Sequence, residues 1–254
     1  MNKTTITSKH GYQIPVVSEM SKYDSKIVIA VHGFCSHKLS TTVVMLLRQL
    51  PKQGIGVISF DFPNHGDHAE EGEAFRVKNC LDDLSTVEKY VAGRFPGVEI
   101  MYFGSSFGAY ITMLYLCRGR GNGTKAFFRS AAVNMPELFL DPTPEDLASL
   151  RDKGYTIIED CDRPIKLTQG FVDDMAANDL FEIFEKSRDI IEDSEIMLKM
   201  IHGDCDESVA YERAAEFANK FDIELVTVPG GDHRLMTPGS PERVLEEALS
   251  LFNR

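Results

Sequence analysis

The chain has 254 residues, of which 43% are hydrophobic and 26% are charged, and its net charge is −12. This composition is that of a globular protein with enough apolar residues for a core, which excludes a disordered chain, a collagen-like repeat and a small disulfide scaffold. The acidic excess makes nucleic acids and anionic membrane surfaces poor partners, because phosphate binding needs a basic surface.

The cellular location is suggested by two further features. The first residues lack the apolar stretch of a secretory signal, and no apolar run is long enough to cross a bilayer. No C-x-x-C pair occurs, and the five cysteines lie far apart at positions 35, 80, 117, 161 and 205. Wide spacing is typical of reduced thiols and does not suit a zinc site. We therefore expect a cytoplasmic protein with reduced cysteines and no metal.

Strands and helices alternate along the first half of the chain. Short runs of β-branched and apolar residues predict buried strands, whereas apolar residues at every third or fourth position predict helices. Two runs that flank His10-Gly11 predict a hairpin at a sheet edge. In chain order we expect strands over 4–8, 13–19 and 26–31, a helix over 41–53, a strand over 54–60, a helix over 74–95, a strand over 99–103, a helix over 107–118 and a strand over 125–134.

The alternation resumes near the C-terminus. Here we expect a strand over 196–201, a helix over 208–220, a strand over 223–228 and a helix from 241 to the end. The fold class is therefore α/β, with a mostly parallel central sheet and helices on both faces, built as a single domain over residues 1–254. Functional residues of such sheets gather at the carboxyl ends of the strands.

Residues 136–194 interrupt this pattern. The segment lacks strong strand signals, and 17 of the 39 acidic residues but only 6 of the 27 basic residues lie between Met135 and Glu195. We interpret it as an inserted cap of short helices that lies over the strand ends. Its apolar side chains either line an acyl or aryl pocket or pack the cap onto the core; they are Phe139, Leu140, Tyr155, Phe171, Met175, Phe181 and Phe184.

A G-x-S-x-G motif follows the predicted strand over 99–103. It comprises residues 104–108, and a helical pattern follows directly. Glycines two positions on either side of Ser106 relieve crowding in a sharp turn that projects the hydroxyl group. The helix N-terminus behind the serine adds N–H donors and positive potential. Ser106 therefore fits the position of a nucleophile, whereas Ser105 does not.

A serine nucleophile needs a base, and the base needs a carboxylate that orients it. Residues 202–206 read H-G-D-C-D after one predicted strand, and His233 follows the next. Both positions lie at carboxyl strand ends, so these side chains can converge on Ser106. The chain order Ser, Asp, His matches one known hydrolase architecture. Asp204 and Asp206 both remain candidates for the acid.

A His-Gly turn at residues 32–33 follows the first predicted parallel strand. Such a turn can aim a backbone N–H at a substrate carbonyl oxygen. We expect the N–H groups of Phe34 and Phe107 to form an oxyanion hole, since Phe107 directly follows the candidate nucleophile.

Other polar residues near these loops are expected to be structural. Asp61 follows the predicted strand over 54–60 and can anchor its loop through hydrogen bonds, and His65 belongs to the same loop. Cys35 and Cys205 lie beside candidate site residues. With Ser106 present, they are expected to pack rather than to act as nucleophiles.

Together these motifs resemble the α/β-hydrolase superfamily over essentially the whole chain. The matching motifs are HGF (32–34), DFPNHG (61–66), GSSFG (104–108), HGDCDESV (202–209) and GGDH (230–233). The chain is similar to small bacterial carboxylesterases, including cinnamoyl and feruloyl esterases, and to the serine-aminopeptidase-type group. The resemblance implies Ser106 as nucleophile, Asp206 as acid through the spacing H-G-x-x-D, and His233 as base. Many relatives have His before the nucleophile and Gly-Gly after it, whereas this chain has Ser105 and Gly108-Ala109, which leaves the subfamily open.

The main hypothesis is a serine hydrolase that cleaves small-molecule carboxylic esters through an acyl-enzyme, without a cofactor or metal. The same residues would serve a thioesterase, or an aminopeptidase whose cap carboxylates hold a substrate ammonium group. A non-catalytic binding protein with this fold is the alternative from another class. Neither a dinucleotide-binding nor a P-loop motif occurs. We expect no nucleic-acid or membrane partner, and the oligomeric state is open between a monomer and a homodimer.

Overall fold

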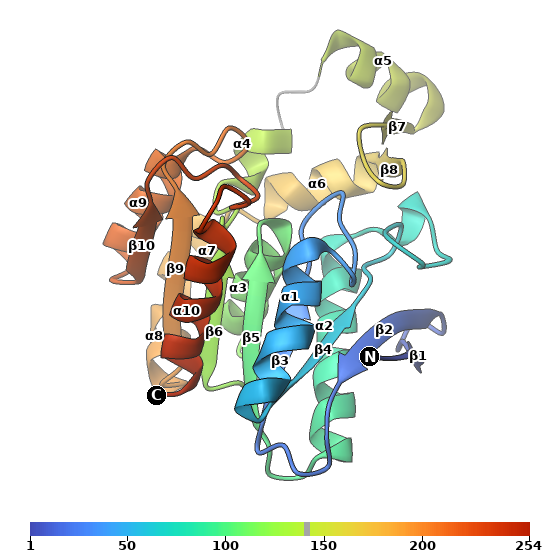
Figure 1. Cartoon of the computed structure of the whole chain (residues 1–254). Coiled ribbons are helices and arrows are strands. Elements are labelled where there is room, and N and C mark those ends of the chain that lie inside the picture. Colours follow the sequence, from blue (N-terminus) through green and yellow to red (C-terminus); the bar gives the residue numbers. More distant parts are fainter. Residues whose placement is uncertain (140–142) are drawn as a thin grey trace.

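A central sheet with the strand order β1-β2-β4-β3-β5-β6-β9-β10 organises the chain in the computed structural model, which describes residues 1–139 and 143–254 (Figure 1). Six neighbouring strands are parallel: β4 (Ile55–Phe60), β3 (Lys26–Val31), β5 (Glu99–Ser105), β6 (Lys125–Arg129), β9 (Met197–Gly203) and β10 (Glu224–Val228). The expected edge hairpin is present, since β2 (Gln13–Glu19) pairs antiparallel with β4, and β1 (Asn2–Thr7) with β2. The predicted α/β class is confirmed.

Helices cover both faces of this sheet. In the view of Figure 1, α1 (Thr41–Gln49) and α10 (Ser240–Phe252) lie in front of the sheet, and α2 (Val77–Arg94) and α3 (Phe107–Cys117) lie behind it, while α9 (Tyr211–Lys220) covers β9 and β10. Strand residues alternate between the two faces: Val28 and Ala30 pack with α1 and α10, whereas Ile27 and Ile29 pack with α2 and α3. Within the described residues, none of the helices has the length and apolar character needed to cross a membrane.

Most predicted elements appear within a few residues of their expected bounds, and the larger differences have local causes. The predicted helix over 41–53 ends at Gln49 and continues as the 3₁₀ turn Leu50–Gln53, which contains a proline in its first turn. Helix α2 begins at Val77 rather than 74, because the Asp174 carboxylate accepts the Val77 N–H at 2.9 Å. The 3₁₀ turn Gly72–Ala74 precedes it. Strand β6 ends at Arg129, where the next residue has a φ of 46°.

The segment between β6 and β9 contains more than the short helices that were expected. Its elements are α4 (Met135–Phe139), α5 (Pro144–Lys153), β7 (Tyr155–Ile158), β8 (Ile165–Thr168), α6 (Gln169–Ala177), α7 (Leu180–Lys186) and α8 (Arg188–Asp193). The strands β7 and β8 form an antiparallel hairpin, which the expectation of a cap built from short helices did not include. Figure 1 shows α4, α5, α6 and this hairpin beyond the carboxyl ends of the parallel strands, whereas α7 and α8 pack against α3.

The apolar side chains of this segment pack onto the core more than they line a pocket. Phe171 and Met175 of α6 and Phe184 of α7 are at most 3% exposed and belong to the main core. Phe181 is partly buried against the same core. Leu140 lies outside the described residues.

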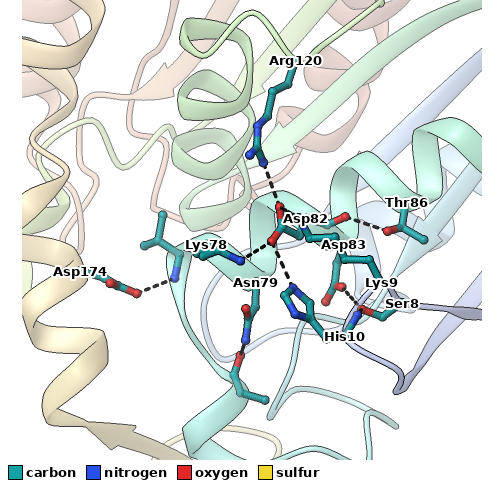
Figure 2. Close-up of polar contacts among 12 residues, drawn as sticks. Ser8, Lys9, His10, Lys78, Asn79, Asp82, Asp83, Thr86, Arg120 and Asp174 are labelled. Atoms are coloured by element: carbon teal, nitrogen blue, oxygen red, sulfur yellow. Dashed lines mark hydrogen bonds and ion pairs between the residues drawn. The ribbon is translucent and has the colours of Figure 1, made fainter.

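Two neighbouring carboxylates of α2 anchor the tip of the β1–β2 hairpin (Figure 2). Asp83 is buried and accepts hydrogen bonds from the hydroxyl groups of Ser8 and Tyr12. Asp82 is 1% exposed and lies 2.8–3.1 Å from four basic groups, which belong to Lys9, His10, Lys78 and Arg120. Because both carboxylates have several partners, the edge strands are fixed to the helix layer.

Candidate active site

Ser106 lies in a sharp turn between β5 and α3, with φ 52° and ψ −116°. This backbone conformation is strained for a residue with a side chain, and it is typical of functional turns. The flanking glycines are needed because the chain is crowded here. A Cβ atom on Gly104 would lie 2.6 Å from Cα of Ala109, and one on Gly108 would lie 2.2 Å from the carbonyl oxygen of Val31.

Ser106, His233 and Asp206 form a continuous hydrogen-bonded chain. The His233 Nε2 atom lies 3.1 Å from Ser106 Oγ, and its Nδ1 atom lies 2.8 Å and 3.0 Å from the two carboxylate oxygens of Asp206. Asp206 follows β9 and His233 follows β10, so the fold brings together three residues that the sequence placed at strand ends. With its Nδ1–H donated to the carboxylate, the imidazole presents Nε2 as an acceptor to the Ser106 hydroxyl.

The Asp206 side chain is fully buried and has hydrogen-bond partners on both oxygens. Its Oδ1 accepts the backbone N–H groups of Ser208 and Val209 at 2.9 Å and 2.8 Å, and its Oδ2 lies 2.9 Å from Nε2 of His202. Burial alone would raise the pKa of Asp206, but the hydrogen bonds from His202 and His233 hold it well below the usual range. The carboxylate is therefore ionised at neutral pH and can orient the imidazole.

The structure distinguishes the two carboxylates that the sequence left open. Asp204 is exposed, and its Oδ1 accepts the backbone N–H of Gly230 at 2.6 Å, which joins the loops after β9 and β10. Asp206, not Asp204, contacts His233. Sequence reasoning missed the support that His202 gives to Asp206, although both belong to the H-G-D-C-D motif, four residues apart.

The loop after β3 approaches the nucleophile turn closely. A Cβ atom on Gly33 would lie 3.2 Å from Cβ of Ser106. His32 is buried and fixes this loop: its Nδ1–H donates to the Gly33 carbonyl at 2.7 Å, and its Nε2 accepts a backbone N–H from the loop after β4 at 3.1 Å. The rings of Phe34 and Phe107 meet edge to face, 6.3 Å apart. Both candidate oxyanion residues therefore lie next to Ser106.

The loop after β4 is held by hydrogen bonds, as predicted for Asp61. This carboxylate is fully buried and accepts the backbone N–H of Lys38 at 2.7 Å, the Lys38 ammonium at 2.5 Å and the backbone N–H of Asp67 at 2.9 Å. His65 bonds to the Pro63 carbonyl through Nδ1 at 2.9 Å. The contacts of Asp61 agree with its predicted role as an anchor of this loop.

Three buried histidines of these loops predict that the fold is sensitive to acid. Burial lowers the pKa of His32 and His65 to about 3 and that of His68 to about 4. In the unfolded chain each would bind a proton near pH 6.5, so the unfolded state takes up more protons as the pH falls. Burial raises the pKa of Asp83 to about 7, so the folded state binds one proton there that the unfolded state does not. This one proton offsets only part of the three that the histidines bind in the unfolded state.

We therefore expect the free energy of unfolding to fall as the pH drops below about 6.5, by roughly 2 kcal/mol per pH unit near pH 5. Urea unfolding at pH 7, 6 and 5 measures this slope. A free energy of unfolding that stays constant or rises between pH 7 and pH 5 would contradict the burial of these histidines in their neutral form.

A disulfide bond joins Cys35, next to Phe34, to Cys161, which lies between β7 and β8. The expectation that all five cysteines are reduced was wrong for this pair. The two residues are 126 positions apart, and wide spacing in sequence does not show which segments the fold brings together. Because disulfides are uncommon in a reducing cytoplasm, the pair does not support the expected location. The other cysteines are free thiols: Cys80, Cys117 and Cys205.

Ser106 and His233 line a cavity of about 1010 Å³, together with Phe34 and Phe107. The loop after β3 and the start of α1 contribute four hydroxyl residues to its lining, which are Ser36, Ser40, Thr41 and Thr42. The lining also includes apolar and acidic side chains, which are Met135, Leu138, Asp160, Asp162 and Glu207. In the part of the chain that the structure describes, no cluster of His, Cys, Asp and Glu side chains could hold a metal ion.

Comparisons with known proteins agree with this architecture. No curated protein sequence matches the chain at a significant level. Among solved structures, the chain is similar to Est1E from Butyrivibrio proteoclasticus, solved with ferulic acid bound, with a TM-score of 0.77 and 22% identity over 99% of this chain and 100% of that chain. It is also similar to the esterase domain of a Rhodothermus marinus protein (TM-score 0.69, 18% identity, 98% of this chain and 96% of that chain).

A third similar structure is alpha/beta hydrolase domain-containing protein 10 from mouse, with a TM-score of 0.74 and 13% identity over 98% of this chain and 99% of that chain. At these identities the likeness shows that the α/β-hydrolase fold is shared. The sequence profile of the family described as "Serine aminopeptidase, S33" matches residues 23–155, more than half of the chain, and this stretch includes Gly33 and Ser106. The chain therefore belongs to this family of hydrolases.

Proposed function

We propose that the protein is a serine esterase that cleaves carboxylic esters of small molecules through an acyl-enzyme. The observation that carries this proposal is the hydrogen-bonded chain from Ser106 through His233 to Asp206 at the wall of a large cavity. His233 takes the hydroxyl proton as Ser106 Oγ attacks the ester carbonyl. Asp206 keeps the imidazole in the required tautomer and stabilises the imidazolium that forms.

The negative charge that develops on the carbonyl oxygen needs donors in place before the reaction. In our proposal the backbone N–H groups of Phe34 and Phe107 supply them. Phe107 is the first residue of α3, where N–H groups have no acceptor within the helix. His233 then donates its proton to the leaving alcohol and activates the water that hydrolyses the acyl-enzyme.

An ester substrate is favoured by the names of two similar structures, which refer to ferulic acid bound to Est1E and to an esterase domain. The family name favours a second candidate, an aminopeptidase. Asp160, Asp162 and Glu207 line the cavity and could hold a substrate ammonium group. Two of them have partners in the structure: Asp162 lies 3.5 Å from Nε2 of His37, and Glu207 accepts the His233 backbone N–H at 3.3 Å.

A substrate panel separates these candidates. The panel contains p-nitrophenyl esters from acetate to octanoate, methyl ferulate, and leucine p-nitroanilide beside its N-acetyl derivative as the matched control. We expect turnover of the esters, and the dependence of the rate on acyl chain length reports the size of the cavity. We expect leucine p-nitroanilide to be cleaved no faster than its N-acetyl derivative. Cleavage of leucine p-nitroanilide well above its N-acetyl derivative and all esters would contradict the esterase proposal and support the aminopeptidase.

A further inference from the structure

Arg129, the last residue of β6, contacts both halves of the candidate site. Its Nε and Nη2 atoms donate to Ser105 Oγ at 3.0 Å and 2.5 Å, and its Nη1 donates to the carbonyl oxygens of His233 and Arg234 at 3.1 Å and 2.6 Å. Its own carbonyl oxygen accepts the backbone N–H of Ser106 at 2.9 Å. One residue therefore binds the nucleophile turn and the loop that carries the base.

The Ser106 turn and the His233 loop are not linked covalently near the site, so noncovalent contacts must hold them in position. Ser106 and His233 are 127 residues apart, and the 3.1 Å hydrogen bond between them depends on how the loop after β10 lies against the turn after β5. Strand β6 is the neighbour of β5 in the sheet, and Arg129 is the register partner of Ser105. The guanidinium bridges from this fixed position to the carbonyl groups of the His233 loop, and its planar fork restricts the geometry of both contacts.

Burying the positive charge of the Arg129 guanidinium costs free energy, which argues that this residue does more than fill space in the core. Arg129 is 8% exposed, and among the described residues its guanidinium donates to a hydroxyl group and to two backbone carbonyl groups rather than to a carboxylate. Burial lowers its pKa to about 10, with the more distant charges of Asp206 and Asp232 acting in the opposite direction, so it remains a cation at neutral pH. An apolar side chain would fill a sheet position at lower cost, because burying an unpaired charge is unfavourable.

We propose that Arg129 is a positioning residue for the hydrolysis reaction, which, with Ser105, holds the His233 loop against the Ser106 turn. This inference rests on the proposed role of Ser106 as nucleophile. Without the guanidinium, the loop would keep its fold but the Nε2–Oγ distance would vary. Misplacement of about 1 Å between reacting groups is enough to cost on the order of 10²-fold in rate.

The test compares Arg129→Met, Arg129→Lys and Ser105→Ala by steady-state hydrolysis of the best p-nitrophenyl ester. We expect Arg129→Met to lower kcat by about 10²-fold with KM within about threefold of wild type. Arg129→Lys should recover part of the loss, because an ammonium can still donate to the two carbonyl oxygens, and Ser105→Ala should lose about 3–10-fold. The matched control is Arg118→Met at the far end of α3, which should keep wild-type kinetics.

Melting temperatures are measured for each variant, and rates are taken well below them. A folded Arg129→Met protein whose kcat lies within threefold of wild type, or whose loss is confined to KM, would overturn the proposal. Should Arg129→Met fail to fold, the other two variants decide: wild-type kcat in both Arg129→Lys and Ser105→Ala would overturn it equally.

Labelling with a fluorophosphonate probe separates this inference from the proposed function. If the wild type reacts and Arg129→Met reacts at least about tenfold more slowly, both proposals are supported. If the two proteins react at the same rate, the positioning role fails while the nucleophile stands. If the wild type does not react at all, the proposed function itself fails.

Discussion

Replacing Ser106 by alanine is expected to lower kcat for ester hydrolysis by roughly 10⁴-fold or more, as loss of a nucleophile generally does. The variant removes the only atom of the hydrogen-bonded chain that attacks the substrate, while the turn, the cavity and the His233–Asp206 contact remain. The measurement is the steady-state turnover of p-nitrophenyl esters by the purified variant. The melting temperature shows whether the variant is folded.

Ser105→Ala provides the matched comparison, because it makes the same chemical change one residue earlier in the same turn. Its expected loss of about 3–10-fold is far smaller than that of Ser106→Ala. Turnover by Ser106→Ala near the wild-type level would exclude this serine as the nucleophile. Equal losses in both variants would indicate damage to the turn rather than removal of a reacting atom.

Asp206→Asn is expected to lower kcat by roughly 10³–10⁴-fold in a protein that still folds. An amide at this position can donate to Nδ1 of His233, which would place the imidazole proton on Nε2. That nitrogen could then no longer accept the proton from Ser106. The reaction should therefore fail even though the side chain keeps its size, and kcat on the same ester measures the loss.

Asp204→Asn is the control for this experiment, since it lies two residues away in the same loop and contacts the Gly230 backbone instead of His233. We expect its kcat to stay within about threefold of wild type. A larger loss in Asp204→Asn than in Asp206→Asn would assign the orienting carboxylate to the other residue.

Sequence alone predicted the parts of the fold that follow from local patterns. Strands β3 and β5 are short apolar runs buried on both faces, and Ser106 lies between glycines that the turn requires. Their positions could be inferred because the sequence pattern that indicates each element lies within the residues that form it. The chain order of Ser106, Asp206 and His233 added the expectation that strand ends would bring them together, and the distances agree with it.

Features that depend on distant segments could not be predicted in this way. The residues alone left Asp204 and Asp206 open, and only the resemblance implied Asp206; the course of the loop after β9, where backbone N–H groups hold the Asp206 carboxylate, places it against His233. The Cys35–Cys161 bond depends on where the β7–β8 hairpin docks. Arg129 lay inside the strand predicted over 125–134, and its contacts with the His233 loop appear only in three dimensions.

The claim at the centre of this account is that Ser106 is an activated nucleophile. Intact-protein mass spectrometry after reaction with a fluorophosphonate probe, followed by peptide mapping, tests it most directly, because the probe bonds covalently to an activated serine. We predict one adduct per wild-type chain, located on Ser106, and none on Ser106→Ala under the same conditions. An adduct on another residue, equal labelling of Ser106→Ala, or no labelling of the wild type would contradict the account.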